Sequence, residues 1–249
     1  MNRRDVLRAS TALGATGVLA GAAGSASAAT AVDQSVAAKE RTDPFRVQVV
    51  MFDGVEELDF AAPYEVFSAA GFFTSRPVEV DYVRASGPAA VTAAYGTRLR
   101  GIGRWAPDEA DVLVVPGGGY GRRDSPGVWA EIDRGTLPRA LAEAARPGLT
   151  IAALCTGVML CSAAGLTRGR PCTTHHRARA DLESQGGVVK NARVVDDGDL
   201  VTAGGITSGL ELALWIVRRE LGPDTALGIE AMMEYEARGT VWAPNTSAR

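Results

Sequence analysis

Three segments of the sequence each place a reactive or hydrogen-bonding group just after an apolar run that is typical of a buried β-strand. Asp59 follows the run at residues 45–52, a row of glycines follows Val115, and Cys155 directly follows Leu154. In open α/β sheets, binding and catalytic sites form at the carboxyl ends of the strands. We therefore expect these three segments to meet at one edge of a sheet.

Cys155 is the candidate nucleophile. It lies where the expected strand at 149–154 gives way to a helix, and a side chain on such a turn is displayed above the sheet. The free N–H groups of the following helix favour a thiolate over a thiol, so we expect the pKa of Cys155 to be lowered. The alternative is an inert buried cysteine, which is our interpretation of Cys161 and Cys172.

Asp59 is the candidate acid. It lies between Leu58 and Phe60, just ahead of an expected helix. Apolar neighbours raise the pKa of a carboxyl group, which could then donate or shuttle a proton beside the sulfur of Cys155. A helix cap or an exposed turn carboxylate is the alternative, and the sequence leaves both interpretations open.

A glycine row and a histidine pair extend this candidate site. Residues 117–119 lack the Lys-Ser/Thr ending of a phosphate-binding loop, but glycines there let backbone N–H groups approach a substrate and stabilise negative charge. His175 and His176 follow two threonines, which allows a Cys–His dyad. The simpler interpretation is a helix whose first turn contains both histidines.

No cofactor, metal ion or disulfide is expected. Cys155 and Cys161 would lie about 9 Å apart along one helix, and a disulfide needs Cα atoms within roughly 7 Å. The two adjacent histidines point in different directions and no CxxC spacing is present, which argues against a zinc site.

Composition and charge restrict the partners. The chain has 249 residues, of which 46% are hydrophobic and 22% are charged, and this suits one globular domain or at most two. The net charge is −3 and no basic cluster is strong enough to attract a phosphate backbone. Nucleic acid is therefore not an expected partner.

The amino terminus has the pattern of a twin-arginine signal peptide. Arg3 and Arg4 precede a weakly apolar stretch and a small-x-small cleavage pattern at 26–28. Residues 1–28 thus predict export by the twin-arginine machinery to an extracytoplasmic or secreted location. A membrane span needs about 20 predominantly apolar residues, so no stable membrane insertion is expected. Residues 29–43 are expected to form a disordered linker.

Strands and helices alternate through the rest of the chain. Ser208 and Glu211 have the spacing of a capping box, and Pro63 suits the first turn of a helix. The alternation predicts parallel βαβ units in a single α/β domain at 44–238, with helices on both faces of the sheet, followed by a tail at 239–249. We expect strands at 45–52, 78–83, 111–115, 149–154, near 172, at 192–195 and at 200–203, and helices at 60–70, 128–145 with a break at Pro138, 156–164, 175–184, 208–221 and 223–235.

Together these segments resemble the PfpI-like branch of the class I glutamine amidotransferase-like superfamily, and within it the isonitrile hydratases. The resemblance covers nearly all of residues 45–235, and it implies a flavodoxin-like sheet. It is carried, in this order, by Glu-Glu-Leu-Asp-Phe-Ala-Ala-Pro at 56–63, Val-Pro-Gly-Gly-Gly at 115–119, Leu-Cys-Thr-Gly at 154–157, Ala-Ala-Gly-Leu at 163–166, Thr-Thr-His at 173–175 and Gly-Gly-Ile-Thr-Ser-Gly at 204–209.

The resemblance also implies roles for individual residues. Cys155 matches the family's nucleophile, Asp59 its partner acid, and Gly118 and Thr156 its oxyanion-hole amides, while His175 would border the substrate pocket. Peptidases of the superfamily carry a histidine directly after the cysteine, whereas Thr156 in that place is similar to the hydratases.

The implied activity is that of a lyase without a cofactor, which hydrates a small electrophile, in particular an isonitrile to an N-substituted formamide. The implied assembly is a homodimer. Two alternatives stay open. One is another thiol-dependent reaction, such as a glyoxalase, deglycase or amidase activity, and the other is a non-catalytic protein that senses redox state or a ligand.

Overall fold

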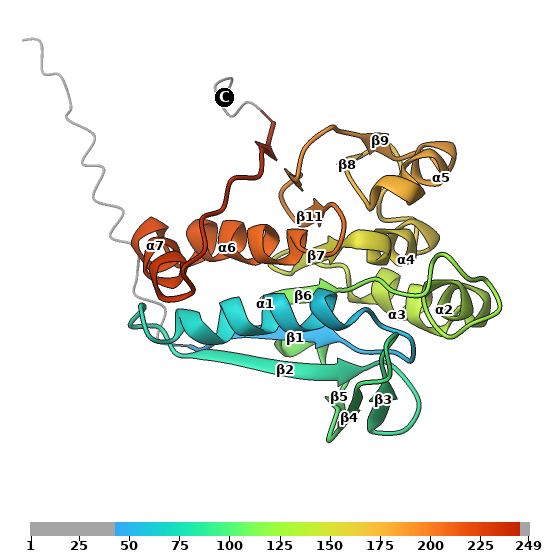
Figure 1. The fold of residues 1–249 in the computed structure, drawn as a ribbon, viewed down its shortest axis with the longest axis horizontal. Coiled ribbons are helices and arrows are strands. Elements are labelled where there is room, and N and C mark those ends of the chain that lie inside the picture. The colour runs from blue at the N-terminus through green and yellow to red at the C-terminus, as the bar shows by residue number, and fades with distance from the viewer. Residues whose placement is uncertain (1–42, 245–249) are drawn as a thin grey trace, which may run out of the picture. The chain divides into compact units, whose positions relative to one another are not determined.

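An eight-stranded sheet runs through residues 43–244, the part of the chain that the computed structural model describes (Figure 1). The expected signal peptide and nearly all of the expected linker lie outside the described residues. The order across the sheet is β12 (Val241–Trp242), β10 (Val194–Asp196), β11 (Leu200–Ala203), β7 (Thr150–Leu154), β6 (Val112–Val115), β1 (Phe45–Val50), β2 (Val78–Arg84) and β5 (Gly103–Arg104).

The sheet is mostly parallel, as the alternation of strands and helices predicts. Neighbouring strands pair in parallel except for β10 and β11, which are antiparallel. The central strands β6, β7 and β11 are short runs of mainly apolar residues that are buried along their whole length. Such runs are typical of strands that are covered on both faces.

Helices cover both faces of the sheet (Figure 1). One group consists of α1 (Glu57–Ala70), α6 (Ser208–Glu220) and α7 (Pro223–Met232), and the other of α2 (Val128–Arg134), α3 (Thr136–Ala144) and α4 (Val158–Ala163). The predicted α/β architecture is thus confirmed. None of the helices between residues 43 and 244 combines the length and the apolar character that crossing a membrane requires.

Two smaller sheets complete the structure. The pair β8 (Pro171–Cys172) and β9 (Val188–Val189) flanks α5 (Arg179–Ser184), which follows a 3-10 turn, η3 (His176–Ala178). The hairpin β3 (Ala90–Thr92) and β4 (Arg98–Arg100) was not predicted, because its strands are only three residues long. A further 3-10 turn, η1 (Pro107–Glu109), precedes β6.

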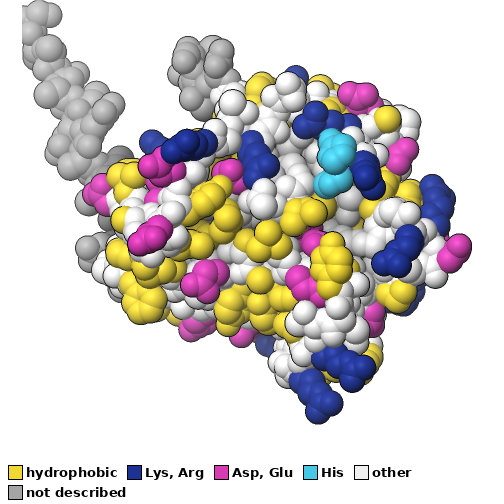
Figure 2. All heavy atoms as spheres, viewed as in Figure 1, with side chains coloured by type: hydrophobic (Ala, Val, Ile, Leu, Met, Phe, Trp, Pro, Cys, Tyr) yellow, Lys and Arg dark blue, Asp and Glu magenta, His cyan; other side chains and the backbone are white. Residues whose placement is uncertain are grey.

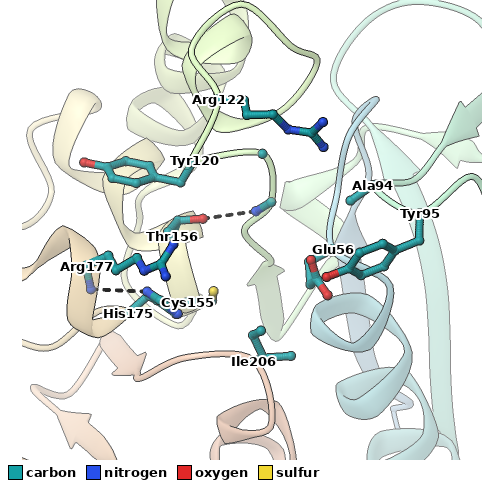
Figure 3. Close-up of a pocket in the computed structure, with 13 residues that line it drawn as sticks. Glu56, Ala94, Tyr95, Tyr120, Arg122, Cys155, Thr156, His175, Arg177 and Ile206 are labelled. Atoms are coloured by element: carbon teal, nitrogen blue, oxygen red, sulfur yellow. Dashed lines mark hydrogen bonds between the residues drawn. The ribbon is translucent and has the colours of Figure 1, made fainter.

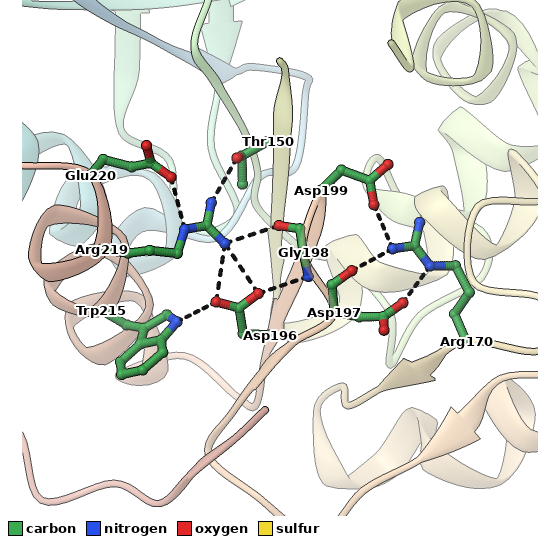
Figure 4. Close-up of polar contacts among 9 residues, drawn as sticks. All are labelled: Thr150, Arg170, Asp196, Asp197, Gly198, Asp199, Trp215, Arg219 and Glu220. Atoms are coloured by element: carbon green, nitrogen blue, oxygen red, sulfur yellow. Dashed lines mark hydrogen bonds and ion pairs between the residues drawn. The ribbon is translucent and has the colours of Figure 1, made fainter. Parts of the chain in front are cut away.

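A polar network fixes α6 against the amino end of β7 (Figure 4). Asp196 accepts hydrogen bonds from Trp215 Nε1 at 2.7 Å and from Arg219 Nη1 at 3.0 Å, and Arg219 Nη2 donates to Thr150 Oγ1 at 2.8 Å. Thr150 begins β7 and Cys155 directly follows its end. The network therefore lies at the end of β7 opposite the candidate nucleophile, and it holds the strand in place.

Two predicted helix details are wrong. α1 begins at Glu57, so Pro63 lies inside the helix and not in its first turn. The break in the segment 128–145 falls at Gly135, whose φ of 71° is left-handed, while Pro138 lies near the start of α3. A left-handed glycine is the usual way to end a helix, and proline is tolerated in a first turn, so the glycine decides the boundary.

The capping box and the carboxyl-terminal boundary also differ from expectation. Ser208 Oγ donates to Gly205 O at 3.1 Å, and Glu211 pairs with Arg193 at 3.1 Å, so neither side chain caps α6. The domain continues beyond residue 238, because β12 adds a strand next to β10. The backbone N–H of Arg193 donates to Thr240 O at 2.9 Å and helps to hold that strand.

Candidate active site

The three segments singled out in the sequence meet at the carboxyl edge of β1, β6 and β7. β6 lies between β1 and β7, so the residues that follow these strands are neighbours. The backbone N–H of Gly117 donates to Oδ2 of Asp59 at 2.9 Å, and that of Gly118 donates to Oγ1 of Thr156 at 3.0 Å. The glycine row therefore bridges Asp59 to the turn that carries Cys155.

Cys155 lies on a sharp turn between β7 and α4. Its φ of 52° is left-handed, which is strained for a residue other than glycine. The surrounding structure holds it there: the N–H of Cys155 donates to Gly204 O at 2.8 Å, and its carbonyl accepts from Thr174 Oγ1 at 2.7 Å. The predicted elbow is present, and it is a 3-10 turn, η2 (Cys155–Gly157), that leads into α4.

The side chain of Cys155 is 5% exposed, yet it lines a cavity of about 270 Å³ (Figure 3). Figure 3 shows its sulfur at the inner end of the cavity, between His175 and Ile206. Cys161 and Cys172 are completely buried and line no such cavity. Of the three cysteines, Cys155 alone borders this cavity.

Asp59 is fully buried in the first turn of α1, so it is not an exposed turn carboxylate. Glu56 occupies the cap position. Burial raises the pKa of Asp59 to about 7, although the Gly117 N–H and the Cys155 thiol act in the opposite direction. Oδ1 of Asp59 has no other hydrogen-bond partner among the described residues. A carboxyl group that titrates near neutrality is suited to accept and return protons.

The expectation of a lowered pKa at Cys155 is wrong. Burial raises the pKa of the Cys155 thiol to about 12, and the Asp59 carboxylate adds to the shift. The backbone N–H groups of Ile206 and Thr156 contact the sulfur and favour the thiolate, but the loss of solvent outweighs them. The resting form at neutral pH is therefore a thiol beside a carboxyl group.

Gly118 and Thr156 both line the cavity, but their N–H groups have different partners. The Gly118 N–H donates to the Thr156 hydroxyl, while the Thr156 N–H points to the sulfur of Cys155. The Thr156 N–H therefore stabilises negative charge that develops at the sulfur.

His175 lines the cavity, and its backbone N–H donates to Cys155 O at 3.4 Å, but among the described residues its ring forms no hydrogen bond with the Cys155 side chain. Its Nδ1 accepts the N–H of Arg177 at 3.2 Å, and its ring lies 4.3 Å from that of His176. Burial, followed by the neighbouring charge of His176, lowers the pKa of His175. The residue is a neutral wall of the cavity, so the geometry favours a positioning role over a Cys–His dyad.

Several cavity residues were not identified from the sequence. Glu56 stands in the acidic run before α1, Tyr95 is at the tip of the unpredicted hairpin, and Arg122 is in the loop after the glycine row. Tyr120, Arg177 and Ile206 complete this set. Of this set, Ile206 could have been singled out from the sequence, because it stands inside the glycine-rich motif at 204–209. In the structure its φ of 39° is left-handed. Between residues 43 and 244, no cluster of three or more His, Cys, Asp or Glu side chains is arranged to hold a metal ion.

Comparison with known proteins finds related sequences and structures. The model of the DJ-1/PfpI family matches residues 45–219. An isonitrile hydratase of Pseudomonas putida is 31% identical over 191 residues, which are 76% of this chain and 78% of that protein. The Parkinson disease protein 7 homolog of Danio rerio is 29% identical over 201 residues, and the match covers 75% of this chain and 95% of that protein. The crystal structure of a ThiJ/PfpI family protein from Pseudomonas syringae superposes with a TM-score of 0.68 at 25% identity, over 78% of this chain and 76% of that one.

Proposed function

The chain belongs to the DJ-1/PfpI family, and on this premise we propose that it hydrates an isonitrile to an N-substituted formamide. The observation that carries the proposal is the pairing of the Cys155 thiol, at the inner end of a small cavity, with a buried carboxyl group, Asp59, whose pKa is about 7. The similarity to an isonitrile hydratase supports the choice of substrate.

The first step forms a covalent adduct. The sulfur of Cys155 attacks the terminal carbon of the isonitrile and forms a carbon–sulfur bond. Asp59 accepts the thiol proton and delivers it to the same carbon, which gives an N-substituted thioimidate. The Ile206 and Thr156 N–H groups stabilise the charge that develops on the sulfur during this transfer.

The second step releases the product. Water adds to the thioimidate carbon and the carbon–sulfur bond breaks. One hydrogen of the water ends on nitrogen and the other restores the Cys155 thiol, so the formamide leaves and the enzyme is regenerated. Glu56 lines the same cavity, and its carboxylate is the group we assign to the removal of a proton from the attacking water.

Burial suits this reaction. A neutral isonitrile reaches the buried sulfur without a large desolvation cost, and a thiol that transfers its proton during attack does not need a low pKa. A cysteine that only reports oxidation is better served by an exposed, low-pKa sulfur. Cys155 has neither property, which favours turnover over redox sensing.

The test is formamide production from a small alkyl isonitrile by the wild-type protein, by Cys155→Ala and by Cys161→Ala. We expect no turnover without Cys155 and near-normal turnover without Cys161, which is buried in α4 away from the cavity. A dicarbonyl substrate assayed in parallel separates glyoxalase or deglycase activity. Full activity of Cys155→Ala would refute the proposed mechanism.

We also propose that residues 1–28 direct export through the twin-arginine pathway and that the protein acts as a homodimer. Replacing Arg3 and Arg4 by lysine should retain the protein in the cytoplasm, which cell fractionation measures. Light scattering of the purified protein measures its mass. A monomer in that experiment would remove the dimer from the proposal and leave the chemistry unaffected.

A further inference from the structure

Two arginines line the cavity that leads to Cys155. Arg122 comes from the loop after β6, and Arg177 comes from η3. Figure 3 shows the guanidinium group of Arg122 extending over the cavity and that of Arg177 near Thr156. Both residues are exposed, and neither guanidinium group forms a hydrogen bond or ion pair with any residue between 43 and 244.

A neighbouring arginine in each segment has a contact within the protein. The guanidinium carbon of Arg123 lies 3.9 Å from the ring centre of Trp129, and Arg179 Nη1 donates to Asn191 Oδ1 at 3.4 Å. Arg122 and Arg177 thus differ from their neighbours in having a charged group available to the cavity. Figure 2 shows basic side chains on both sides of the histidine pair on this face of the molecule.

The backbones that carry these two arginines are held in place. The N–H of Arg122 donates to Gly119 O at 3.1 Å, and its carbonyl accepts from Ser125 Oγ at 2.8 Å. The N–H of Arg177 donates to Nδ1 of His175 at 3.2 Å. Both side chains therefore extend from hydrogen-bonded turns at the cavity wall.

The acidic residue of the cavity lining does not neutralise this charge. Glu56 lies across the cavity from Arg177 in Figure 3, and it pairs with neither arginine. Burial, followed by the adjacent Glu57, raises the pKa of Glu56. The cavity therefore presents two unpaired cations to a ligand that reaches the sulfur.

We propose that Arg122 and Arg177 bind a carboxylate on the substrate and that its electrophilic carbon then faces Cys155. Guanidinium groups bind carboxylates through paired, charge-assisted hydrogen bonds. Given the proposed function, on which this inference rests, the substrate class is a small isocyano carboxylate. Its hydration gives the corresponding N-formylamino carboxylate, with the same atom balance as the reaction above. A cavity of about 270 Å³ suits a molecule of that size.

Alkylation of Cys155 by iodoacetate and by iodoacetamide tests the charge preference without any isonitrile. The two reagents are nearly equal in size and differ in charge, and mass spectrometry gives both rate constants. The ratio of the iodoacetate rate to the iodoacetamide rate is compared among wild type, Arg122→Gln, Arg177→Gln and the double variant. The matched control is Arg139→Gln, because Arg139 is exposed on α3 and lines none of the cavity.

We expect the ratio to fall about threefold to tenfold in the double variant, as for exposed charge pairs, with the iodoacetamide rate nearly unchanged. The ratio in Arg139→Gln should equal that of wild type. An unchanged ratio in the double variant overturns the proposal, as does an equal fall in the control. If neither reagent alkylates Cys155, the proposal is also overturned, because a substrate of similar size could not reach the sulfur.

Turnover of isocyanoacetate and of its methyl ester provides the second measurement. The KM for the acid should rise in the double variant while its kcat and the kinetics of the neutral ester stay close to wild type. If wild type hydrates neither compound but the alkylation ratio behaves as expected, the carboxylate subsite stands and the isonitrile reaction is rejected.

Discussion

Oδ2 of Asp59 accepts a hydrogen bond of 2.9 Å from the backbone N–H of Gly117, which leaves Oδ1 of the same carboxyl group buried beside Cys155. One oxygen is thus fixed by the glycine row, and the other is available for a proton. A change at Asp59 should therefore alter both the reaction of the Cys155 thiol and the pH dependence of stability.

Asp59→Asn should lower kcat/KM by about 10² to 10⁴, the usual contribution of a positioned acid or base. Asp59 must be ionised to accept the thiol proton, and its pKa is about 7, so wild-type activity should rise with pH through neutrality and then level off. The variant should lack this rise. Measuring kcat/KM between pH 5 and 9 for both proteins checks the prediction.

Asp53→Asn is the control for that experiment. Asp53 pairs with Arg84 at 2.7 Å and lines no part of the cavity. Its pH–rate profile should keep the wild-type shape. A rise through pH 7 that persists in Asp59→Asn would assign the titration to another group and remove Asp59 from the mechanism.

The same carboxyl group should make stability depend on pH. The pKa of Asp59 is 3.8 for an unperturbed carboxyl group and about 7 in the folded protein, so the folded state binds the proton more tightly. This contribution to stability is complete below pH 4 and is lost as the pH rises through 7. As the pH rises from 4 to 8, the free energy of unfolding of wild type should therefore fall relative to that of Asp59→Asn by an amount on the order of 4 kcal/mol.

Chemical denaturation at pH 4 and pH 8 measures this difference. Asp53→Asn should behave in the opposite way. Burial acts to raise the pKa of Asp53, but the hydrogen bonds from Thr92 and Arg84 and the charge of Arg84 together outweigh it. The pKa is therefore lowered, and the Asp53 carboxylate stabilises the fold above pH 4. An Asp59→Asn variant whose stability follows that of wild type at both pH values would show that this carboxyl group is not perturbed.

Glu56→Gln should slow the release of product more than the formation of the adduct. If the Glu56 carboxylate removes a proton from water, a glutamine at this position leaves the thioimidate on Cys155 to accumulate. Mass spectrometry of the intact protein during turnover should then show a larger fraction of adduct than in wild type. Glu65→Gln on the exposed side of α1 is the control and should not accumulate it. An equal fraction in Glu56→Gln and wild type would exclude this role.

The candidate site residues could be found in the sequence because the ends of the strands are visible there. Cys155, Asp59 and the glycine row each follow an apolar run, and parallel strands bring their carboxyl ends together. The direction of the Cys155 pKa shift could not be predicted in this way. It depends on how completely the side chains around the sulfur exclude water, which a local strand–turn–helix pattern does not reveal.

Several other residues that line the cavity could not be predicted from the sequence. Tyr95 belongs to a hairpin with three-residue strands, and Arg122 lies in the loop between β6 and α2. Neither position belongs to an element with a regular apolar period. The predicted capping box at Ser208 failed for a similar reason, since tertiary partners at Gly205 and Arg193 compete for both side chains.

Thr156→Val should destabilise the turn between β6 and α2. The Thr156 hydroxyl accepts the buried N–H of Gly118, and valine has the same shape without an acceptor. A buried donor left unpaired costs about 1 to 3 kcal/mol. The free energy of unfolding should fall by this amount in Thr156→Val and by much less in Thr156→Ser, which keeps the hydroxyl. Equal losses in the two variants would show that packing of the methyl group is what stabilises the turn.

Gly157→Ala should damage the site by moving α4 away from β6. A Cβ at Gly157 would lie 2.2 Å from Val115 O and 2.5 Å from Pro116 O, and both are backbone atoms of the segment that carries the glycine row. The cost should be about 3 kcal/mol or more, because neither backbone can move without breaking its neighbours' hydrogen bonds. Gly121→Ala is the matched control, since a Cβ there meets nothing within 4 Å. Thermal unfolding should show a large loss for Gly157→Ala alone. If both variants unfold at the wild-type temperature, the close approach of α4 to β6 does not contribute to holding the Cys155 turn.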